Sequence, residues 1–203
     1  MNLPNKLTIS RMFAIPVIIT LSLLPFFSKV IFGSEGYEVT LENTIILIIF
    51  ALASFTDFLD GHIARKNNLI TNFGKFMDPL ADKLLVLTAL IYLLERGRIQ
   101  AFGFSLGFVI TIILAREFMV TGIRLLAVDN NVVIAASKLG KAKTISQMLM
   151  IIVLLANNYP FVLLGDLAGE ITSLVLISLS GLLTLVSGID YFLKNKEIIL
   201  KSK

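Results

Sequence analysis

Six long apolar runs divide this chain and constrain its fold more than any other feature. Each run holds about 20 residues, the length that an α-helix needs to cross the hydrocarbon core of a bilayer. Of the 203 residues, 56% are hydrophobic, which is too large a share for a soluble domain of this size. We therefore predict an all-α, polytopic membrane protein, one domain over residues 1–203, with six transmembrane helices near 12–27, 44–64, 75–95, 104–126, 144–164 and 171–193.

The segment before the first run, residues 2–11, is polar to amphipathic, and we predict that it forms a short interfacial helix. The basic residues set the orientation of the chain. With the N-terminus in the cytoplasm, the outer loops hold only Lys29, Arg96 and Arg98 of the 18 Lys and Arg residues. This distribution follows the positive-inside rule. We predict a multi-pass protein of the cell membrane whose two termini and active site face the cytoplasm.

Four aspartates lie inside two neighbouring apolar runs: Asp57, Asp60, Asp78 and Asp82. At helical spacing, each pair shares a helix face with small residues. One aspartate in the middle of a membrane helix costs about 3 kcal/mol, so four of them require metal ions, basic partners or a watery pocket.

The composition narrows the choice of metal. The chain has no cysteine and one histidine, which excludes thiolate sites and multi-histidine zinc sites. Carboxylates alone select hard cations such as Mg²⁺, Mn²⁺ or Ca²⁺. Two such ions suit displacement at phosphorus. The residues alone therefore point to metal-assisted phosphoryl or phosphatidyl transfer at the membrane face.

The pattern D-x2-D-G-x2-A-R-x8-G-x3-D-x3-D at 57–82 resembles the signature of the CDP-alcohol phosphotransferase family, with every signature position filled. Four further motifs are similar to the bacterial phosphatidylglycerophosphate synthase branch of that family: N-L-P-N-x-L-T-x-x-R at 2–11, R-E-F-x-V-T-G-x-R at 116–124, A-A-S-x-L-G-K-x-K-T at 135–144 and S-G-I-D-Y-F at 187–192. The resemblance implies a six-helix homodimer that converts CDP-diacylglycerol and sn-glycerol 3-phosphate into phosphatidylglycerol phosphate and CMP.

The same resemblance implies roles for individual residues. The four aspartates would hold two divalent metal ions, Mg²⁺ or Mn²⁺, and Asp82 would also be the catalytic base for the glycerol hydroxyl. Residues that match the positions binding the CDP-lipid are Asn5, Thr8, Gly61, Ala64, Arg65 and Gly74. For the phosphate of the acceptor we choose basic residues of the flanking motifs: Arg116, Arg124, Lys141, Lys138 and Lys143.

Alternative readings remain open at this point. The acceptor alcohol could be inositol phosphate, serine or a lipid, although the basic cluster favours a phosphorylated acceptor. An ion-coupled transporter also uses intramembrane acids, but near the midplane. Here Asp57 lies about 12 Å, and Asp82 about 10 Å, from the cytoplasmic boundary. Ion pairing of the aspartates with Arg65, Lys75 or Lys83 would leave the small residues unexplained. Besides substrates we expect membrane lipids, and no nucleic acid, as partners.

Overall fold

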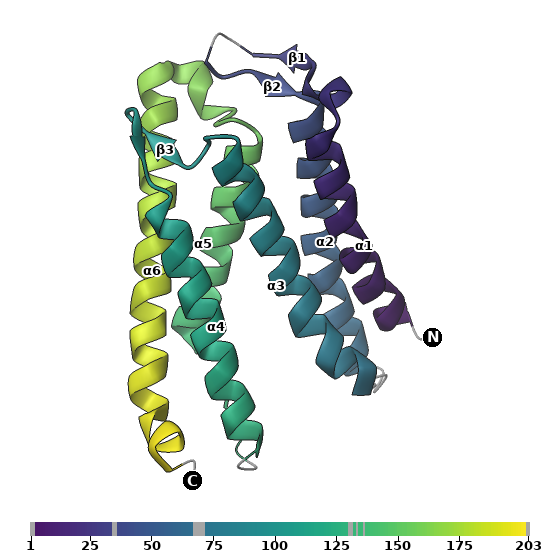
Figure 1. Ribbon diagram of the computed structural model, residues 1–203, viewed down its shortest axis with the longest axis vertical. Coiled ribbons are helices and arrows are strands. Elements are labelled where there is room, and N and C mark those ends of the chain that lie inside the picture. The colour runs from purple at the N-terminus through teal and green to yellow at the C-terminus, as the bar shows by residue number, and fades with distance from the viewer. Residues whose placement is uncertain are drawn as a thin grey trace. The chain divides into compact units, whose positions relative to one another are not determined.

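The computed structural model describes residues 3–33, 36–66, 72–129, 132, 134–135 and 137–201. Within them lie six α-helices (Figure 1): α1 (Leu3–Leu23), α2 (Leu41–Lys66), α3 (Asn72–Glu95), α4 (Phe108–Asp129), α5 (Lys138–Leu155) and α6 (Asp166–Lys201). The prediction of a mainly helical chain is confirmed, and one helix overlaps each of the six apolar runs. The shifts are largest for α1 and α5, each of which begins and ends before its predicted span.

Short elements connect the helices. Two antiparallel hairpins pair β1 (Val30–Phe32) with β2 (Val39–Thr40) and β3 (Gln100–Ala101) with β4 (Phe104–Ser105). Two turns of 3₁₀-helix, η1 (Pro25–Ser28) and η2 (Phe161–Leu164), complete the connections.

The chain forms two compact units. The first comprises Met1–Arg98 and Ile151–Val162, and the second comprises Ile99–Met150 and Leu163–Lys203. In the first unit α1 packs against both α2 and α3, and in the second unit α4 packs against α6. Whether residues 1–203 act as one domain stays a prediction.

The N-terminal helix differs from the expectation. The separate interfacial helix predicted over residues 2–11 is wrong, because α1 runs without a break from Leu3 to Leu23. Its polar residues Asn5, Thr8 and Arg11 are 8%, 0% and 1% exposed. They recur at helical spacing on the buried face of α1, so tertiary packing, and not a membrane surface, accounts for them.

Two helices among the described residues are long and apolar enough to cross a membrane, at Asn5–Leu23 and Asp166–Glu197, and α2 adds a shorter apolar segment, Leu41–Thr56. Two such helices indicate a membrane protein. Charged residues lie in two of the other helices: α4 carries Arg116, Glu117 and Arg124, and α5 begins with three lysines. Six spans remain a prediction.

In the first unit, an ion pair joins α2 to Arg96, the residue that follows α3. Arg96 Nη2 donates to Glu42 Oε1 at 2.8 Å and to the Ser22 carbonyl oxygen at 2.8 Å, and the Glu42 side chain is only 3% exposed. Beside it, the Tyr92 hydroxyl donates to Asn43 Oδ1. The guanidinium of Arg98 donates to Asn157 Oδ1 and to the Glu38 carbonyl oxygen, and burial lowers its pKa. These contacts fix the connections at the ends of the helices.

A polar stripe on α6 is buried in the second unit. Ser180, Thr184 and Ser187 are fully buried and recur every three or four residues, so they share one helix face. Gln147 of α5 donates to Thr184 Oγ1 at 2.9 Å. An interhelical hydrogen bond of this kind satisfies a polar group that would otherwise lie unpaired in an apolar interior.

Candidate active site

The acidic signature spans the end of α2 and the beginning of α3, two helices that pack together. The backbone is helical at all four aspartates, as predicted. Asp82 is half-buried. The side chains of the other predicted ligands, Asp57, Asp60 and Asp78, lie outside the described part of the chain, as do those of Gly61, Ala64, Arg65 and Gly74. Their roles therefore stay predictions, and the all-oxygen donor set matches the preference of Mg²⁺ and Mn²⁺.

Among the described side chains, no group of three His, Cys, Asp or Glu residues could hold a metal ion. Because three of the four predicted ligands are not in that set, this observation does not test the metal site.

The N-terminal helix brings polar side chains to the signature helices. Asn5 and Thr8, predicted to contact the CDP-lipid, are buried on α1, the helix that packs against α2 and α3. Arg11 is buried on the same helix and was not among the predicted site residues. The sequence position of Arg11 could have identified it as a candidate, because an arginine that ends a polar motif at the start of an apolar run requires a buried partner.

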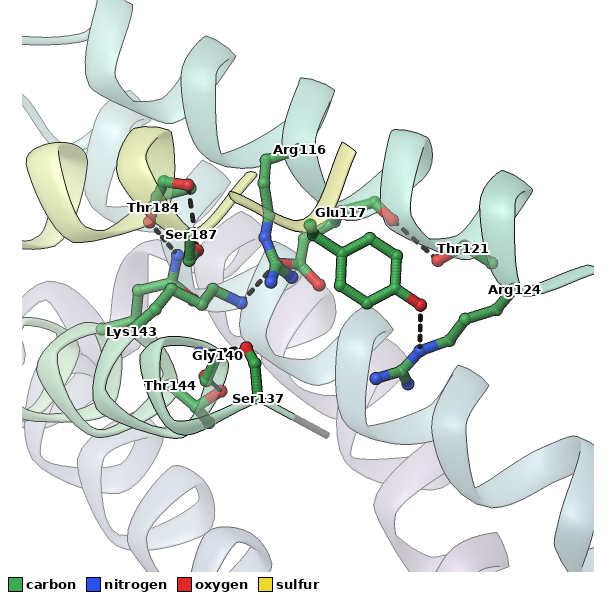
Figure 2. Close-up of polar contacts among 12 residues, drawn as sticks. Arg116, Glu117, Thr121, Arg124, Ser137, Gly140, Lys143, Thr144, Thr184 and Ser187 are labelled. Carbon is green, nitrogen blue, oxygen red and sulfur yellow. Dashed lines mark hydrogen bonds and ion pairs between the residues drawn. The ribbon is translucent and has the colours of Figure 1, made fainter. Parts of the chain in front are cut away.

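A compact charged cluster joins α4 to α5 in the second unit (Figure 2). Glu117 Oε1 accepts hydrogen bonds from Lys143 Nζ and, at 3.2 Å, from Arg116 Nη1. The exposed fractions of these side chains are 12% for Glu117, 6% for Lys143 and 11% for Arg116. One carboxylate thus pairs with two of the five predicted acceptor-binding cations. The three described side chains together carry one net positive charge.

Arg116 retains an unused donor within this cluster. Its Nε is buried and has no hydrogen-bond partner among the described residues. A buried guanidinium N–H without a partner is costly, so this atom is a candidate contact for an anionic ligand.

The second predicted arginine contacts α6. Arg124 Nε donates to the Tyr191 hydroxyl at 3.3 Å, and the guanidinium carbon lies 5.9 Å from the centre of the tyrosine ring. The Arg124 side chain is otherwise exposed. Its position is therefore set by a hydrogen bond and a cation–π contact with the same residue.

The remaining predicted cations lie in the first turn of α5. Ser137 precedes this helix and accepts a hydrogen bond from the Gly140 backbone N–H at 3.0 Å, as an N-terminal capping residue does. Lys138 and Lys141 are both exposed. The structure thus divides the five cations into a buried pair, Arg116 and Lys143, and three with exposed side chains.

Three residues of this region were not among the predicted site residues. Glu117 accepts hydrogen bonds from both Arg116 and Lys143. Gly188 and Tyr191 belong to the S-G-I-D-Y-F motif, to which no role was given. The motif itself was the signal, because a glycine and a tyrosine three residues apart share one face of an apolar helix.

Known proteins resemble this chain over nearly its whole length. Residues 1–186 match the family model described as CDP-alcohol phosphatidyltransferase. A Bacillus subtilis protein named CDP-diacylglycerol–glycerol-3-phosphate 3-phosphatidyltransferase is 41% identical over 99% of this chain and 98% of its own length. A Rickettsia bellii protein of the same name is 40% identical over 94% of this chain and 93% of its own length. The aspartate signature and the flanking motifs at 2–11, 116–124 and 135–144 lie within the residues that the family model matches. The chain therefore belongs to the CDP-alcohol phosphatidyltransferase family.

Proposed function

We propose that this protein transfers the phosphatidyl group of CDP-diacylglycerol to sn-glycerol 3-phosphate, giving phosphatidylglycerol phosphate and CMP. The observation that carries the proposal is the 41% identity, over 99% of the chain, to a relative named for this reaction. The complete aspartate signature on α2 and α3 supports the transferase chemistry. The cluster of cations on α4 and α5 supports an acceptor that carries its own phosphate.

Asp57, Asp60, Asp78 and Asp82 would hold two divalent cations, Mg²⁺ or Mn²⁺. When bound, such ions neutralise the phosphate oxygens and the charge that develops on the departing CMP. The small residues Gly61, Ala64 and Gly74 would leave room for the nucleotide beside the helix backbone. Arg65, Asn5 and Thr8 would bind the pyrophosphate and cytidine portions of the CDP-lipid.

In the proposed reaction, a glycerol hydroxyl oxygen attacks the phosphorus atom that bears the diacylglycerol. The bond from that phosphorus to the bridging oxygen breaks, and the electron pair leaves with CMP. The hydroxyl proton passes to the Asp82 carboxylate, which acts as a general base.

The acceptor phosphate would bind to the cations of the second unit. Arg116 contributes a buried guanidinium with an unused Nε, and Arg124 contributes an exposed one fixed by Tyr191. Lys141, Lys138 and Lys143 supply further positive charge. A guanidinium binds phosphate through two parallel N–H groups, which gives orientation as well as affinity.

The family and the apolar helices support a membrane location. We also propose that the protein spans the membrane six times as a homodimer in contact with membrane lipids, with its termini and active site toward the cytoplasm. The distribution of Lys and Arg residues supports this orientation.

The direct test is an assay for CMP release with purified protein in detergent. We expect CMP release from CDP-diacylglycerol only when Mg²⁺ or Mn²⁺ and glycerol 3-phosphate are both present, and none after chelation of the metal. Replacing glycerol 3-phosphate by serine or inositol phosphate should abolish the signal. A preference for one of these would retain the chemistry and reassign the acceptor.

The site residues are tested by Asp57→Ala and Asp82→Asn, which should remove turnover without unfolding the protein. Glu95→Gln is the matched control, because Glu95 is an exposed acid at the far end of the same helix α3 as Asp82. Full activity of either aspartate variant would refute the assignment of these residues.

A further inference from the structure

Gly188 of α6 lies directly against the side chain of Arg116. A Cβ atom built at Gly188 would be 2.9 Å from Arg116 Cγ and 3.5 Å from Met119 Cε. Real Cβ atoms essentially never approach another heavy atom this closely. Gly188 is in the middle of a helix and has no positive φ angle. A glycine is therefore needed at this position because it has no side chain, and not because it allows an unusual backbone conformation.

The space is used by the stem of Arg116, which passes Gly188 on the way to the charged cluster. Beyond this point, Arg116 Nη1 reaches Glu117 Oε1 at 3.2 Å, and Nη2 would lie 3.8 Å from a Cβ built at Gly140. Figure 2 shows the guanidinium between Glu117 and the start of α5. The contact at Gly188 involves Cγ, close to the backbone of α4, so the far end of the side chain cannot absorb a clash there.

We propose that Gly188 is a positioning residue for the acceptor-phosphate site. Because Gly188 has no side chain, Arg116 Cγ can lie against α6. Arg116 can then adopt the rotamer that carries its guanidinium into the cluster with Glu117 and Lys143. The inference rests on the proposed function, because it assumes that Arg116 binds the phosphate of the acceptor. Gly188 itself does not contact the substrate in this arrangement and acts only through Arg116.

Gly188→Ala should misplace Arg116 without removing its charge. The new methyl group forces Arg116 into another rotamer or pushes α4 and α6 apart. Because displacement of a binding group by about 1 Å is costly for a preorganised site, we expect the KM for glycerol 3-phosphate to rise about tenfold, a change that corresponds to about 1.4 kcal/mol. The KM for CDP-diacylglycerol should stay within about twofold.

Gly181→Ala is a closely matched control. Gly181 lies seven residues earlier on the same face of α6, and a Cβ built there would be 3.0 Å from Val109 Cγ1 of α4. The overlap is nearly the same and involves the same two helices, but the neighbour is an apolar side chain. Any effect of separating the helices should appear in both variants, whereas only Gly188→Ala should raise the KM for glycerol 3-phosphate.

A double-mutant cycle with Arg116→Ala isolates the contact itself. Arg116→Ala removes Cγ, so Gly188→Ala should cause no further rise in KM in that background. An equal rise in both backgrounds, or an equal rise caused by Gly181→Ala, would overturn the proposal. If Gly188→Ala alone does not fold, the double variant should fold, since the clash is gone. Failure of the double variant as well would also overturn it.

The double-mutant cycle separates the proposed role of Arg116 in binding the acceptor phosphate from the proposed positioning role of Gly188. Arg116→Ala by itself should raise the KM for glycerol 3-phosphate at least as much as Gly188→Ala. If Arg116→Ala leaves this KM unchanged, the acceptor assignment and the positioning role both fail. If Arg116→Ala raises it and Gly188→Ala behaves like Gly181→Ala, only the positioning role fails.

Discussion

Lys143 of α5 donates a hydrogen bond to Glu117 of α4, and the two side chains are only 6% and 12% exposed. Arg116 Nη1 donates to the same carboxylate oxygen. A single acid therefore neutralises part of the positive charge that the sequence assigns to the acceptor phosphate. The arrangement keeps two cations close together in a region where their mutual repulsion would otherwise be weakly screened.

The first prediction concerns this carboxylate. Glu117→Gln removes the negative charge that pairs with a buried lysine and a buried arginine, and we expect the free energy of unfolding to fall by about 2–4 kcal/mol. Thermal unfolding in detergent measures the change. The control is Asp190→Asn, which removes the acid of the i,i+4 pair with Lys194, whose side chain is 67% exposed. That substitution should change stability by less than about 0.5 kcal/mol, and similar losses in the two variants would contradict the prediction.

The second prediction concerns the hydroxyl group that holds Arg124. Tyr191→Phe keeps the ring but removes the acceptor for Arg124 Nε, so the guanidinium should become less ordered. We expect the KM for glycerol 3-phosphate to rise about threefold, in keeping with the loss of one weak hydrogen bond to a charged group. Tyr191→Leu also removes the cation–π contact and should have the larger effect. Steady-state kinetics measures this KM. Tyr159→Phe is the control: a similar rise in that variant would mean that loss of any tyrosine hydroxyl has this effect.

The third prediction separates stability from catalysis. Arg96→Ala leaves the Glu42 carboxylate buried without its cation, and we expect a loss of about 2–3 kcal/mol in the free energy of unfolding. The turnover number of the protein that remains folded should be unchanged. Lys29→Ala, at an exposed lysine of the same unit, should affect neither quantity. A large fall in turnover with intact stability would show that Arg96 serves the reaction.

The fourth prediction tests the orientation in the membrane. The chain contains no cysteine, so a single introduced cysteine is the only site for a maleimide label. Ser105→Cys, in the β3–β4 hairpin, should react with a membrane-impermeant maleimide in right-side-out vesicles. Ala142→Cys, exposed near the start of α5, should react only after the vesicles are opened. The reverse pattern would place the active site on the other side of the membrane.

The apolar runs predict the approximate positions of the helices, because runs of about 20 apolar residues are typical of helices and not of loops. They did not predict that α1 is continuous, because polarity alone does not distinguish a residue at a membrane surface from one buried in a helix contact. Thr8 and Arg11 read as polar, and both are buried.

The candidate site shows the same limit. Spacing assigns Arg116 and Arg124 to one face of α4, and both do contact residues of α6. Spacing cannot identify which residues of another helix meet them, since this depends on the packing of two helices distant in sequence. Gly188 and Tyr191 emerge only from the three-dimensional contacts. The metal-binding roles of Asp57, Asp60 and Asp78 are still predictions, because their side chains are not among those described.

The close approach of Gly188 to Arg116 links two positions 72 residues apart in the chain. Related proteins should therefore vary at these positions in concert: where the counterpart of Arg116 is a short residue, the counterpart of Gly188 is free to be larger. If Arg116 binds the acceptor phosphate as proposed, an enzyme whose acceptor carries no phosphate is released from both constraints at once. Selection for a new acceptor would thus act on α6 as well as on the residues that touch the substrate.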